Sequence, residues 1–512
     1  MSASREKKKR QEFLASGGVD PKTARAAEQQ AAEKKAKILY STLAVVFVVV
    51  AVFLVVYNSG ILQRSKTAVT IDGENYTVAD VSYYYGNAYQ SVLNNLGSYA
   101  TIFGLDTTQS LKEQTANSMI TGSDEDMTWD EYFKNQAVSS MKFVHAVLAK
   151  ANEEGMTLDD EDMETFDANV EQMKTQAASA GYSYKAYLSV IYGSVMTPSV
   201  YESNLKDNLL VSKYANAYYD SLSFTDEEVQ AYYEENKNTY DLVDGGYVYI
   251  SGAPETKTDD DGNTVEATDE EKAAAMEEAK AAAEEILAAY EDGKTLEELA
   301  ETYGGTYIGS ENQTYSSNVG GDWLFDESRK AGDTAVLEDE SNSRYYVAVF
   351  NSRRRDETPG YSVRHILITE DNLDLAEGEE ATDEMLEEKA QQILSDWDGT
   401  EEGFASLAEQ YSQDTGSNTN GGLYEDVVKG SMVTSFNNWC YEDGRKAGDT
   451  GIVSSDYGYH IMYFVGYSDD PTLEYWYYTC NNRLISNAYS EWQTETTDSV
   501  TAEVQNGMDS VG

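Results

Sequence analysis

A six-residue segment occurs twice in this chain of 512 residues, and its recurrence restricts the folds that the chain can adopt. Arg329–Thr334 and Arg445–Thr450 share the sequence RKAGDT and lie 116 residues apart. The same offset relates the apolar strand Tyr247–Ile250 to Val363–Ile366. A sequence that recurs at a fixed spacing indicates a repeated structural unit. The chain is therefore predicted to contain two homologous domains in tandem.

Both copies are predicted to have the same order of elements. An opening strand leads into a Glu-, Ala- and Lys-rich helix, a second helix, a Gly-Gly turn, the RKAGDT turn and a final strand. The Gly-Gly turns and final strands are placed at Gly320-Gly321 and Gly421-Gly422, and at Tyr345–Phe350 and His460–Val465. Strands mixed with helices in this order predict α+β domains, at residues 242–353 and 357–468.

Twenty residues without a charge, Ile38 to Tyr57, precede these domains. As a helix they would span about 30 Å, the thickness of a bilayer core. Residues 1–37 carry ten Lys or Arg against five Asp or Glu, so the positive-inside rule predicts a cytoplasmic basic tail. A cleaved signal peptide is the alternative, but its apolar region is usually about 7–15 residues long. We predict a single-pass transmembrane signal anchor at 38–57, with most of the chain outside the cell membrane.

Composition excludes several classes of site. A net charge of −54 argues against nucleic-acid binding, because phosphates repel such a surface. No zinc spacing, phosphate loop or nucleophile elbow occurs, so neither a metal nor a cofactor is expected. Asp259–Asn263 resembles a calcium loop only faintly and is interpreted as a turn, since the ligand spacing is wrong. Cys440 and Cys480 could pair outside the cell or remain free.

Between the anchor and the first repeat, residues 69–241 have a mainly helical pattern after a short hairpin. The hairpin is predicted at Val69–Tyr76, with Asp72-Gly73 as its turn. Residues 472–495 form a further helical segment, and residues 496–512 are predicted to be a disordered tail.

Only three histidines occur in the chain. His145 lies in a predicted helix and is interpreted as a core or boundary residue. His365 lies in the opening strand of the second repeat and His460 in its final strand. If these strands are antiparallel neighbours at the centre of a sheet, the two side chains would meet.

Four motifs of the second repeat resemble the parvulin family of peptidyl-prolyl cis-trans isomerases. In the order of that family, they are Val363–Ile368, Tyr411–Leu423, Met432–Phe436 and Asp456–Ile461. The resemblance implies a four-stranded sheet with flanking helices and isomerisation of X–Pro bonds.

The resemblance also implies roles for individual residues. The catalytic residues would be His365, Asp414, His460 and Ser455, and the pocket for the proline ring would consist of Leu423, Met432 and Phe436. Tyr424-Glu425 departs from the family, which has Gly after this Leu, and this puts the rim of the groove in doubt.

The first repeat lacks the features that imply catalysis in the second. At the offset of 116 residues, Tyr249 stands in the place of His365, and Tyr345-Tyr346 falls near that of His460. The Asp-Thr-Gly-Ser run is missing as well. This copy is predicted to keep the fold without the activity and to serve in spacing or client binding.

The helical domain resembles the chaperone domain of PrsA- and SurA-like extracytoplasmic foldases, on motifs such as Ile71–Glu74 and Gly181–Leu188. In that family a C-terminal helix often completes the helical domain, so the resemblance implies this role for residues 472–495. The resemblances imply an isomerase and foldase of a Gram-positive bacterium, and the predicted anchor at 38–57 would attach it to the membrane, a departure from familiar members of that group, which are lipoproteins. Its partners would be unfolded or partly folded exported polypeptides with X–Pro bonds, and membrane lipid through residues 38–57. A homodimer is left open. The alternative function is a non-catalytic holdase that uses the repeats as a client-binding scaffold, and a structural anchor of the cell envelope is a weaker one.

Overall fold

The computed structural model describes residues 7–9, 37, 45–49, 61–123, 126–258, 264–376, 378 and 380–512. Within these ranges, none of the helices has the length and apolar character needed to cross a membrane. The predicted basic tail, the predicted anchor at 38–57 and the turn at Asp259–Asn263 lie wholly or mostly outside the described residues.

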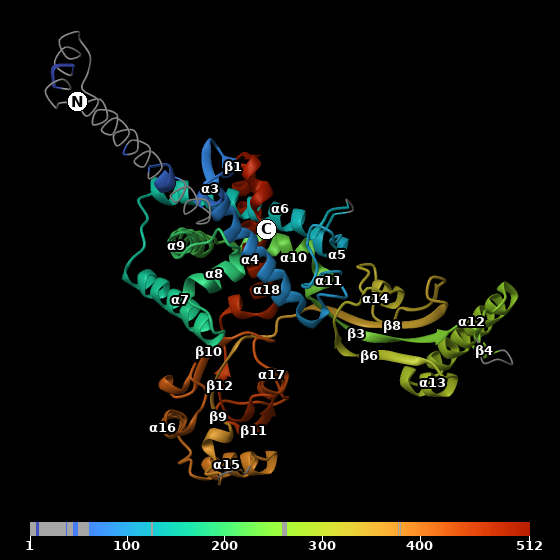
Figure 1. The fold of residues 1–512 in the computed structure, drawn as a ribbon. Coiled ribbons are helices and arrows are strands. Elements are labelled where there is room, and N and C mark those ends of the chain that lie inside the picture. The colour runs from blue at the N-terminus through green and yellow to red at the C-terminus, as the bar shows by residue number, and fades with distance from the viewer. Residues whose placement is uncertain are drawn as a thin grey trace. The chain divides into compact units, whose positions relative to one another are not determined.

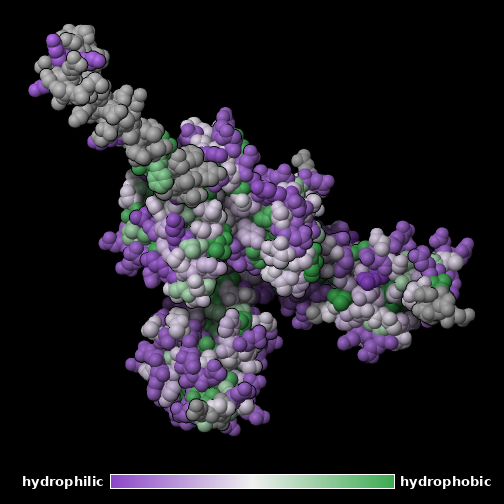
Figure 2. All heavy atoms as spheres, viewed as in Figure 1, coloured by the Kyte–Doolittle hydropathy of each residue, from purple (hydrophilic) through white to green (hydrophobic). Residues whose placement is uncertain are grey.

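The chain forms two compact units (Figure 1). Unit 1 comprises the chain up to Leu222 together with Tyr489–Gly512, and unit 2 comprises Ser223–Ala488. In sequence, unit 2 is therefore an insertion into unit 1. Figure 2 shows hydrophilic side chains over most of the visible face of both units, in keeping with the high net charge.

Unit 1 contains a small antiparallel sheet with the strand order β13-β1-β2. Its strands are β1 (Thr67–Ile71), β2 (Glu74–Thr77) and β13 (Ala502–Val504). The turn between β1 and β2 has positive φ angles at Asp72 (45°) and Gly73 (86°), as an Asp-Gly hairpin turn requires. The hairpin thus lies where the sequence predicts it.

The helices of unit 1 surround an apolar core that contains Trp129, Phe133 and Met141. They are α3 (Ile61–Arg64), α4 (Val78–Leu96), α5 (Ser118–Thr121), α6 (Trp129–Glu153), α7 (Asp160–Ser179), α8 (Tyr184–Tyr192), α9 (Pro198–Ser221) and the end of α18 (Tyr475–Asp498). Thr77 and Thr128 begin α4 and α6 with reciprocal capping boxes, which satisfy backbone N–H groups at these helix ends.

The prediction of a disordered tail at 496–512 is wrong. The α18 helix continues to Asp498, β13 pairs with β1, and a 3-10 helix follows at Asn506–Ser510. Val500, Met508 and Val511 are buried in the core of unit 1. The polar composition of the tail concealed these apolar side chains, whose burial stabilises the segment.

The predicted domain boundary at residue 241 also changes. Helices α10 (Asp226–Glu235) and α11 (Lys237–Tyr240) belong to unit 2. Val229 and Tyr233 of α10 pack with Trp476 and Cys480 at the start of α18. The helical domain therefore ends at Leu222, and it is completed by residues 489–512 instead of 472–495.

Unit 2 contains both repeats, and each repeat has a four-stranded antiparallel sheet. The first sheet has the order β6-β3-β8-β7 and the second β10-β9-β12-β11. The first repeat consists of β3 (Asp241–Ser251), β4 (Lys257–Thr258), β5 (Thr264–Val265), α12 (Asp269–Glu291), α13 (Leu296–Tyr303), β6 (Thr306–Gln313), α14 (Val319–Leu324), β7 (Thr334–Asp339) and β8 (Arg344–Arg355). The second consists of β9 (Tyr361–Ile368), α15 (Asp383–Ser395), α16 (Glu401–Tyr411), β10 (Leu423–Val427), α17 (Thr434–Cys440), β11 (Thr450–Ser455) and β12 (Gly458–Tyr467).

Each sheet has a long-helix face and a short-helix face. In the second repeat, Ile366 and Ile368 of β9 pack with residues of α15 and α16 on one face. Val363 of β9 packs with Phe436 and Cys440 of α17 on the other. Alternate residues of a strand point to opposite faces, so odd-numbered positions of β9 point towards α17.

The structure corrects one of the two predicted Gly-Gly turns. Gly421 and Gly422 lie in a turn with positive φ angles, but Gly320 and Gly321 lie inside α14. Gly320 and Phe436 are 116 residues apart in sequence, and they lie in the corresponding short helices α14 and α17. Trp323 and Trp439 also correspond, and an Arg side chain stacks on each.

The two cysteines do not form a disulfide. Cys440 in α17 and Cys480 in α18 are free and buried. Burial raises the pKa of each thiol to about 12, so both remain protonated at neutral pH.

The C-terminal segment can be tested by a pair of substitutions. Met508→Ala should lower the free energy of unfolding by about 2–4 kcal/mol, because it leaves a cavity in the core of unit 1. Glu503→Ala, on an exposed position of β13, should change it by less than about 0.5 kcal/mol. Chemical denaturation of the whole chain measures both values. Equal, negligible effects would mean that the segment does not pack as described.

Candidate active site

The two central strands of the second sheet bring His365 and His460 together. β9 and β12 are antiparallel neighbours, and His365 lies opposite Met462 while His460 lies opposite Leu367. The two imidazole rings stack with their centroids 5.3 Å apart, and their Nδ1 atoms are 3.1 Å apart. Both side chains are almost fully buried. The predicted meeting of the two histidines is confirmed.

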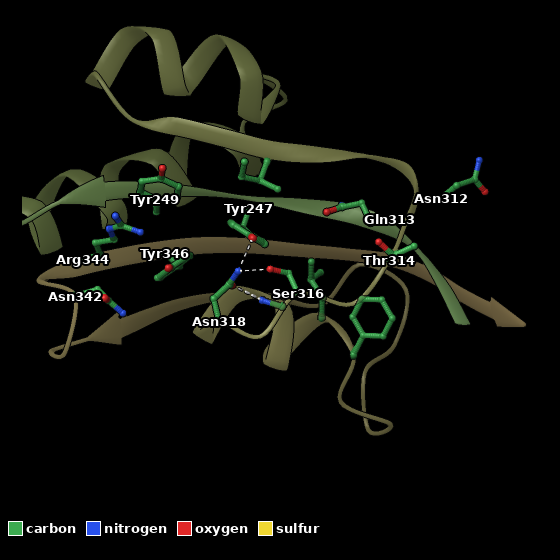
Figure 3. A pocket seen from close by; sticks show the side chains of 14 residues that line it. Tyr247, Tyr249, Asn312, Gln313, Thr314, Ser316, Asn318, Asn342, Arg344 and Tyr346 are labelled. Atoms are coloured by element: carbon green, nitrogen blue, oxygen red, sulfur yellow. Dashed lines mark hydrogen bonds between the residues drawn. The ribbon is translucent and has the colours of Figure 1, made fainter. Parts of the chain in front are cut away.

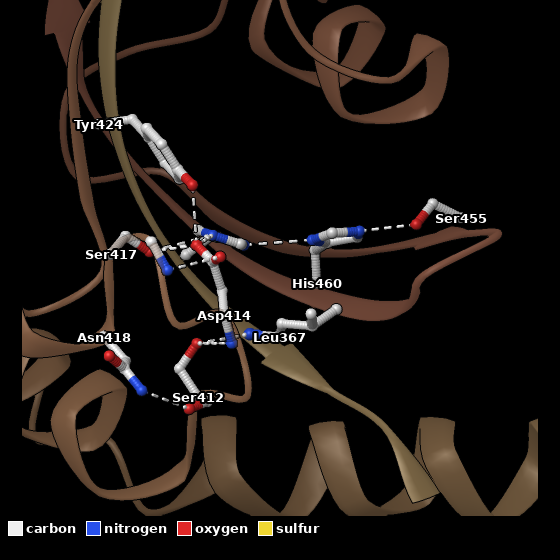
Figure 4. Close-up of polar contacts among 10 residues, drawn as sticks. Leu367, Ser412, Asp414, Ser417, Asn418, Tyr424, Ser455 and His460 are labelled. Carbon is white, nitrogen blue, oxygen red and sulfur yellow. Dashed lines mark hydrogen bonds and ion pairs between the residues drawn. The ribbon is translucent and has the colours of Figure 1, made fainter. Parts of the chain in front are cut away.

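The histidines belong to a longer line of polar contacts (Figure 4). Ser455 Oγ lies 2.7 Å from His460 Nε2 at one end. His365 Nε2 lies 2.8 Å from Asp414 Oδ2 at the other. The structure therefore brings all four predicted catalytic residues into one hydrogen-bonded chain.

The carboxylate of Asp414 determines the direction of the hydrogen bonds along this line of polar contacts. An ionised carboxylate can only accept hydrogen bonds, so His365 donates from Nε2. When His365 is neutral, its other nitrogen accepts, and His460 donates to it from Nδ1. His460 Nε2 is left to accept the hydroxyl proton of Ser455. Every donor thus points towards Asp414.

Asp414 Oδ2 accepts two further hydrogen bonds, from Ser417 Oγ at 2.5 Å and Tyr424 Oη at 2.9 Å. The hydrogen bond from His365 is the largest of the effects that hold the pKa of this carboxyl well below its usual range. Partial burial acts in the opposite direction and is outweighed. The carboxyl is therefore ionised throughout the physiological pH range.

Burial lowers the pKa of the His460 imidazole to about 4, because it disfavours the charged form. The neighbouring His365 lowers this pKa further, and Asp414 raises it. His460 is therefore neutral at pH 7, as the direction of the hydrogen bonds requires.

A tight turn positions Asp414. The backbone N–H of His365 donates to the carbonyl of Gly422, which has a φ of 69°. A Cβ atom at Gly422 would lie 2.2 Å from the carbonyl oxygen of His365, so only glycine fits there. At the other end of the loop, Ser412 Oγ accepts from the backbone N–H groups of Leu367 and Asp414. The loop is thus fixed to β9 on both sides of the carboxylate.

One of the three predicted pocket residues contacts the histidines, and a second packs in the same apolar cluster as the first. Phe436 is buried and contacts both imidazole rings edge-on, with centroid distances of 5.4 Å to His365 and 5.5 Å to His460. Met432 is partly buried and packs in the same cluster.

The third predicted pocket residue, Leu423, is not brought to this group. It lies opposite Arg364, whose side chain reaches Glu401 of α16, so Leu423 is on the long-helix face. The next residue, Tyr424, points to the histidine face, with its ring centroid 5.5 Å from His365. The position that we assigned to Leu423 in this face is therefore occupied by Tyr424.

Sequence reasoning missed Ser417 and treated Tyr424 only as a departure at the rim. A signal for Ser417 exists, since a hydroxyl three residues after Asp414 can reach back to its carboxylate. For Tyr424 the signal is the period of two in β10, which places neighbouring residues on opposite faces. His145 lies in α6 of unit 1, where Tyr76 Oη is 2.8 Å from its Nδ1.

The region that contains the second repeat matches a known protein family. The family described as PPIC-type PPIASE domain matches residues 345–465, which include all four residues of the hydrogen-bonded chain. PPIC-type domains are parvulin domains, so the chain carries a parvulin domain in its second repeat.

Curated relatives are similar to part of the chain. Foldase protein PrsA 1 of Listeria monocytogenes is 32% identical over 147 residues, which are 29% of this chain and 42% of that protein. Foldase protein PrsA of Geobacillus sp. is 43% identical over 77 residues, which are 15% of this chain and 27% of that protein. The chain thus matches less than half the length of these relatives.

A solved structure of PrsA from Bacillus subtilis covers 76% of this chain and 93% of its own, at 15% identity and a TM-score of 0.27. A foldase protein PrsA from Streptococcus pneumoniae has 10% identity and a TM-score of 0.29, and covers 76% and 91%. TM-scores this low carry no argument about the arrangement of the chain.

The buried neutral state of His460 predicts a pH dependence of stability. The imidazole binds its proton more weakly in the folded chain, with a pKa of about 4, than in the unfolded chain, where the ordinary value is about 6.5. The contribution of His460 to the free energy of unfolding is therefore complete above pH 6.5, and it is lost as the pH falls towards 4. Over this interval the loss is about 3 kcal/mol at most.

Denaturant titrations of the wild type and His460→Gln between pH 8 and 4 measure this effect. The glutamine variant keeps a polar side chain that does not titrate, so its stability should fall less over this range. Parallel curves for the two proteins would show that His460 is not held neutral by the fold.

Proposed function

We propose that the chain is a parvulin-type peptidyl-prolyl cis-trans isomerase and foldase for exported polypeptides, with its active site in the second repeat. The observation that carries the proposal is the hydrogen-bonded chain from Ser455 through His460 and His365 to Asp414, within the segment that matches the isomerase family.

Rotation about an X–Pro bond is slow because amide resonance gives a barrier of roughly 18–20 kcal/mol. The reaction breaks no covalent bond, so a catalyst has only to bind the twisted amide more tightly than either planar form. It needs an apolar surface that holds the ring and polar groups that favour the altered charge distribution of the twisted amide.

The residues around the histidines could supply both. Phe436 offers apolar surface beside the imidazole rings, and Met432 packs in the same cluster. Asp414 fixes a negative charge at one end of the hydrogen-bonded chain, and the aligned donors orient the dipoles of both imidazoles. Groups held rigidly in this way need no reorganisation when the amide twists. We assign His365, Asp414, His460 and Ser455 to this electrostatic role and assign no nucleophile.

We propose Met432, Phe436 and Tyr424 as the residues that contact the proline ring and its neighbours. Tyr424 replaces Leu423 in this proposal, because its ring lies on the histidine face of the sheet. Its hydroxyl is engaged by Asp414, so the ring is held in one orientation.

Anchoring in the cell membrane is part of the proposal. The twenty uncharged residues at 38–57 and the basic residues before them support a single-pass anchor with a cytoplasmic N-terminus. The resemblance to proteins named foldase supports an extracytoplasmic role in a Gram-positive bacterium. Clients would be unfolded or partly folded exported chains.

The alternative is a non-catalytic holdase that uses both repeats as a scaffold. The rich aromatic content of the chain, including forty tyrosines, fits a surface that holds unfolded chains. The buried polar chain favours catalysis, because a scaffold has no need of two desolvated histidines and a carboxylate aligned in one direction.

An assay of proline isomerisation on a short chromogenic peptide tests the proposal. His365→Ala and His460→Ala should each reduce kcat/KM by about tenfold or more, since each interrupts the chain to Asp414. His145→Ala is a matched control, because it removes the same side chain from unit 1 and should leave the rate unchanged. If both repeat variants retain the wild-type rate and fold normally, the catalytic proposal is wrong.

Tyr424→Phe offers a subtler test, because it keeps the ring and removes one donor to Asp414. We expect a decrease in kcat/KM of about tenfold or more, because one hydrogen bond to a charged group contributes about 1.5–3 kcal/mol. Suppression of aggregation of an unfolded client, measured with the same variants, separates the two functions. A holdase activity that persists in His365→Ala while isomerisation is lost would show that the chain has both.

A further inference from the structure

The first repeat contains a hollow with a cavity volume of about 570 Å³ on the short-helix face of its sheet (Figure 3). Tyrosines, side-chain amides and a single arginine make up most of its wall. The lining residues used below are Tyr247, Tyr249, Tyr346, Gln313, Asn318 and Arg344.

The final strands of the two repeats can be aligned on their RKAGDT turns. In each, the glycine of the turn donates its backbone N–H to the carbonyl of a phenylalanine in the final strand, Phe350 or Phe464. These two residues are therefore equivalent. Four positions earlier lie Tyr346 and His460, so Tyr346 takes the place of His460.

The strand register then fixes the partner of Tyr346. Two positions before the phenylalanine, Ala348 pairs with Tyr247 and Met462 pairs with His365. Tyr247, and not Tyr249 as the constant offset suggests, therefore takes the place of His365. The turn between the last two strands accounts for the difference, because it has four residues after Asp339 in the first repeat and two after Ser455 in the second. A displacement of two residues keeps the side chain on the same face of the sheet.

The tyrosine pair has the ring separation of the histidine pair, although the tyrosines meet edge to face and the histidines stack. The ring centroids of Tyr247 and Tyr346 are 5.4 Å apart, against 5.3 Å for the two histidines. The corresponding helix position is Phe436 in the second repeat and Gly320 in the first. A Cβ atom at Gly320 would lie 2.8 Å from the ring of Tyr247, so the glycine leaves room for the larger ring.

The residues that line the hollow include neither a carboxylate nor a histidine. Asn318 Nδ2 donates to Tyr247 Oη at 3.0 Å, where the second repeat has a carboxylate against its histidine. Gln313 and Asn342 add further amide groups to the lining. Side-chain amides can bond to peptide N–H and C=O groups alike, whereas nothing in this wall reproduces the histidine chain.

Arg344 is the one charged residue of the lining. Its guanidinium lies over the ring of Tyr249, 4.5 Å from the centroid, and forms no ion pair among the residues that the structure describes. Asp339, opposite it on β7, bonds instead to the backbone and side chain of Asn342. An unpaired arginine in a chain with a net charge of −54 is a site for an incoming carboxylate.

We propose that this hollow binds an extended peptide segment in which a proline or aromatic residue adjoins an acidic one. The ring stacks on the tyrosines, the amides bond to the peptide backbone, and the carboxylate pairs with Arg344. Aromatic-lined grooves hold proline-containing segments in this manner. The segment is held and not isomerised, since tyrosines and an asparagine replace the histidines and Asp414.

This inference extends the proposed function, because it gives the first repeat the task of holding a client whose X–Pro bonds the second repeat isomerises. It adds a preference for acidic flanks that the second repeat does not supply. Figure 3 shows the labelled side chains spread along the sheet, as an elongated ligand requires.

Fluorescence anisotropy with the whole chain and a dye-labelled peptide containing Glu-Pro-Phe tests the proposal. Arg344→Gln should weaken binding about tenfold and Arg344→Glu more, whereas a Lys-Pro-Phe peptide should bind weakly to the wild type and be unaffected by Arg344→Gln. Lys294→Glu makes a comparable charge change at an exposed site of the same repeat and should leave affinity unchanged. A benzophenone group on the peptide should crosslink to residues of the first repeat.

Equal affinity of the wild type and both Arg344 variants would overturn the proposal, as would crosslinks confined to the second repeat. The isomerase assay on the same proteins keeps the two proposals apart. Arg344→Glu should retain the wild-type kcat/KM on a short neutral peptide. A wild type that binds the acidic peptide through Arg344 but lacks isomerase activity would contradict only the proposed function.

Discussion

The hydrogen bond from His365 to Asp414 joins the central strand of the second repeat to the loop that follows α16. Because the carboxylate can only accept, this bond sets the proton positions of both histidines and of Ser455. It also requires the loop to approach β9 so closely that Gly422 tolerates no side chain. Ser417 and Tyr424 complete the shell around the same oxygen. Sheet, loop and polar chain therefore depend on one partly buried charge.

The fold of unit 2 could largely be predicted from the sequence, because the duplicated RKAGDT turn marks equivalent points in two domains. The limits of unit 1 could not. Its last strand is three residues long, and its pairing with β1 depends on a register that no local pattern records. The role of α10 was hidden similarly, since its apolar residues Val229 and Tyr233 contact a helix more than two hundred residues away.

Within the candidate site, the residue types of the polar chain were predictable and the side-chain directions were not. A single residue separates Leu423 from Tyr424, and that step reverses the face of the sheet. In the first repeat a constant offset selects Tyr249, whereas the register selects Tyr247. The exchange of Phe436 for Gly320 makes room for Tyr247, a correlation of volumes that only packing reveals.

The position of unit 2 within the sequence of unit 1 has a consequence for the order of assembly. Val69 pairs with Val504, so the sheet of unit 1 cannot close until nearly the whole chain is available. During synthesis or export from the N-terminus, the residues of both repeats emerge before that closure. Folding of the insert first would draw the ends of a very long loop together and lower the entropy cost of joining them. Unit 1 is therefore the last part of the protein to complete its fold, after the two repeats.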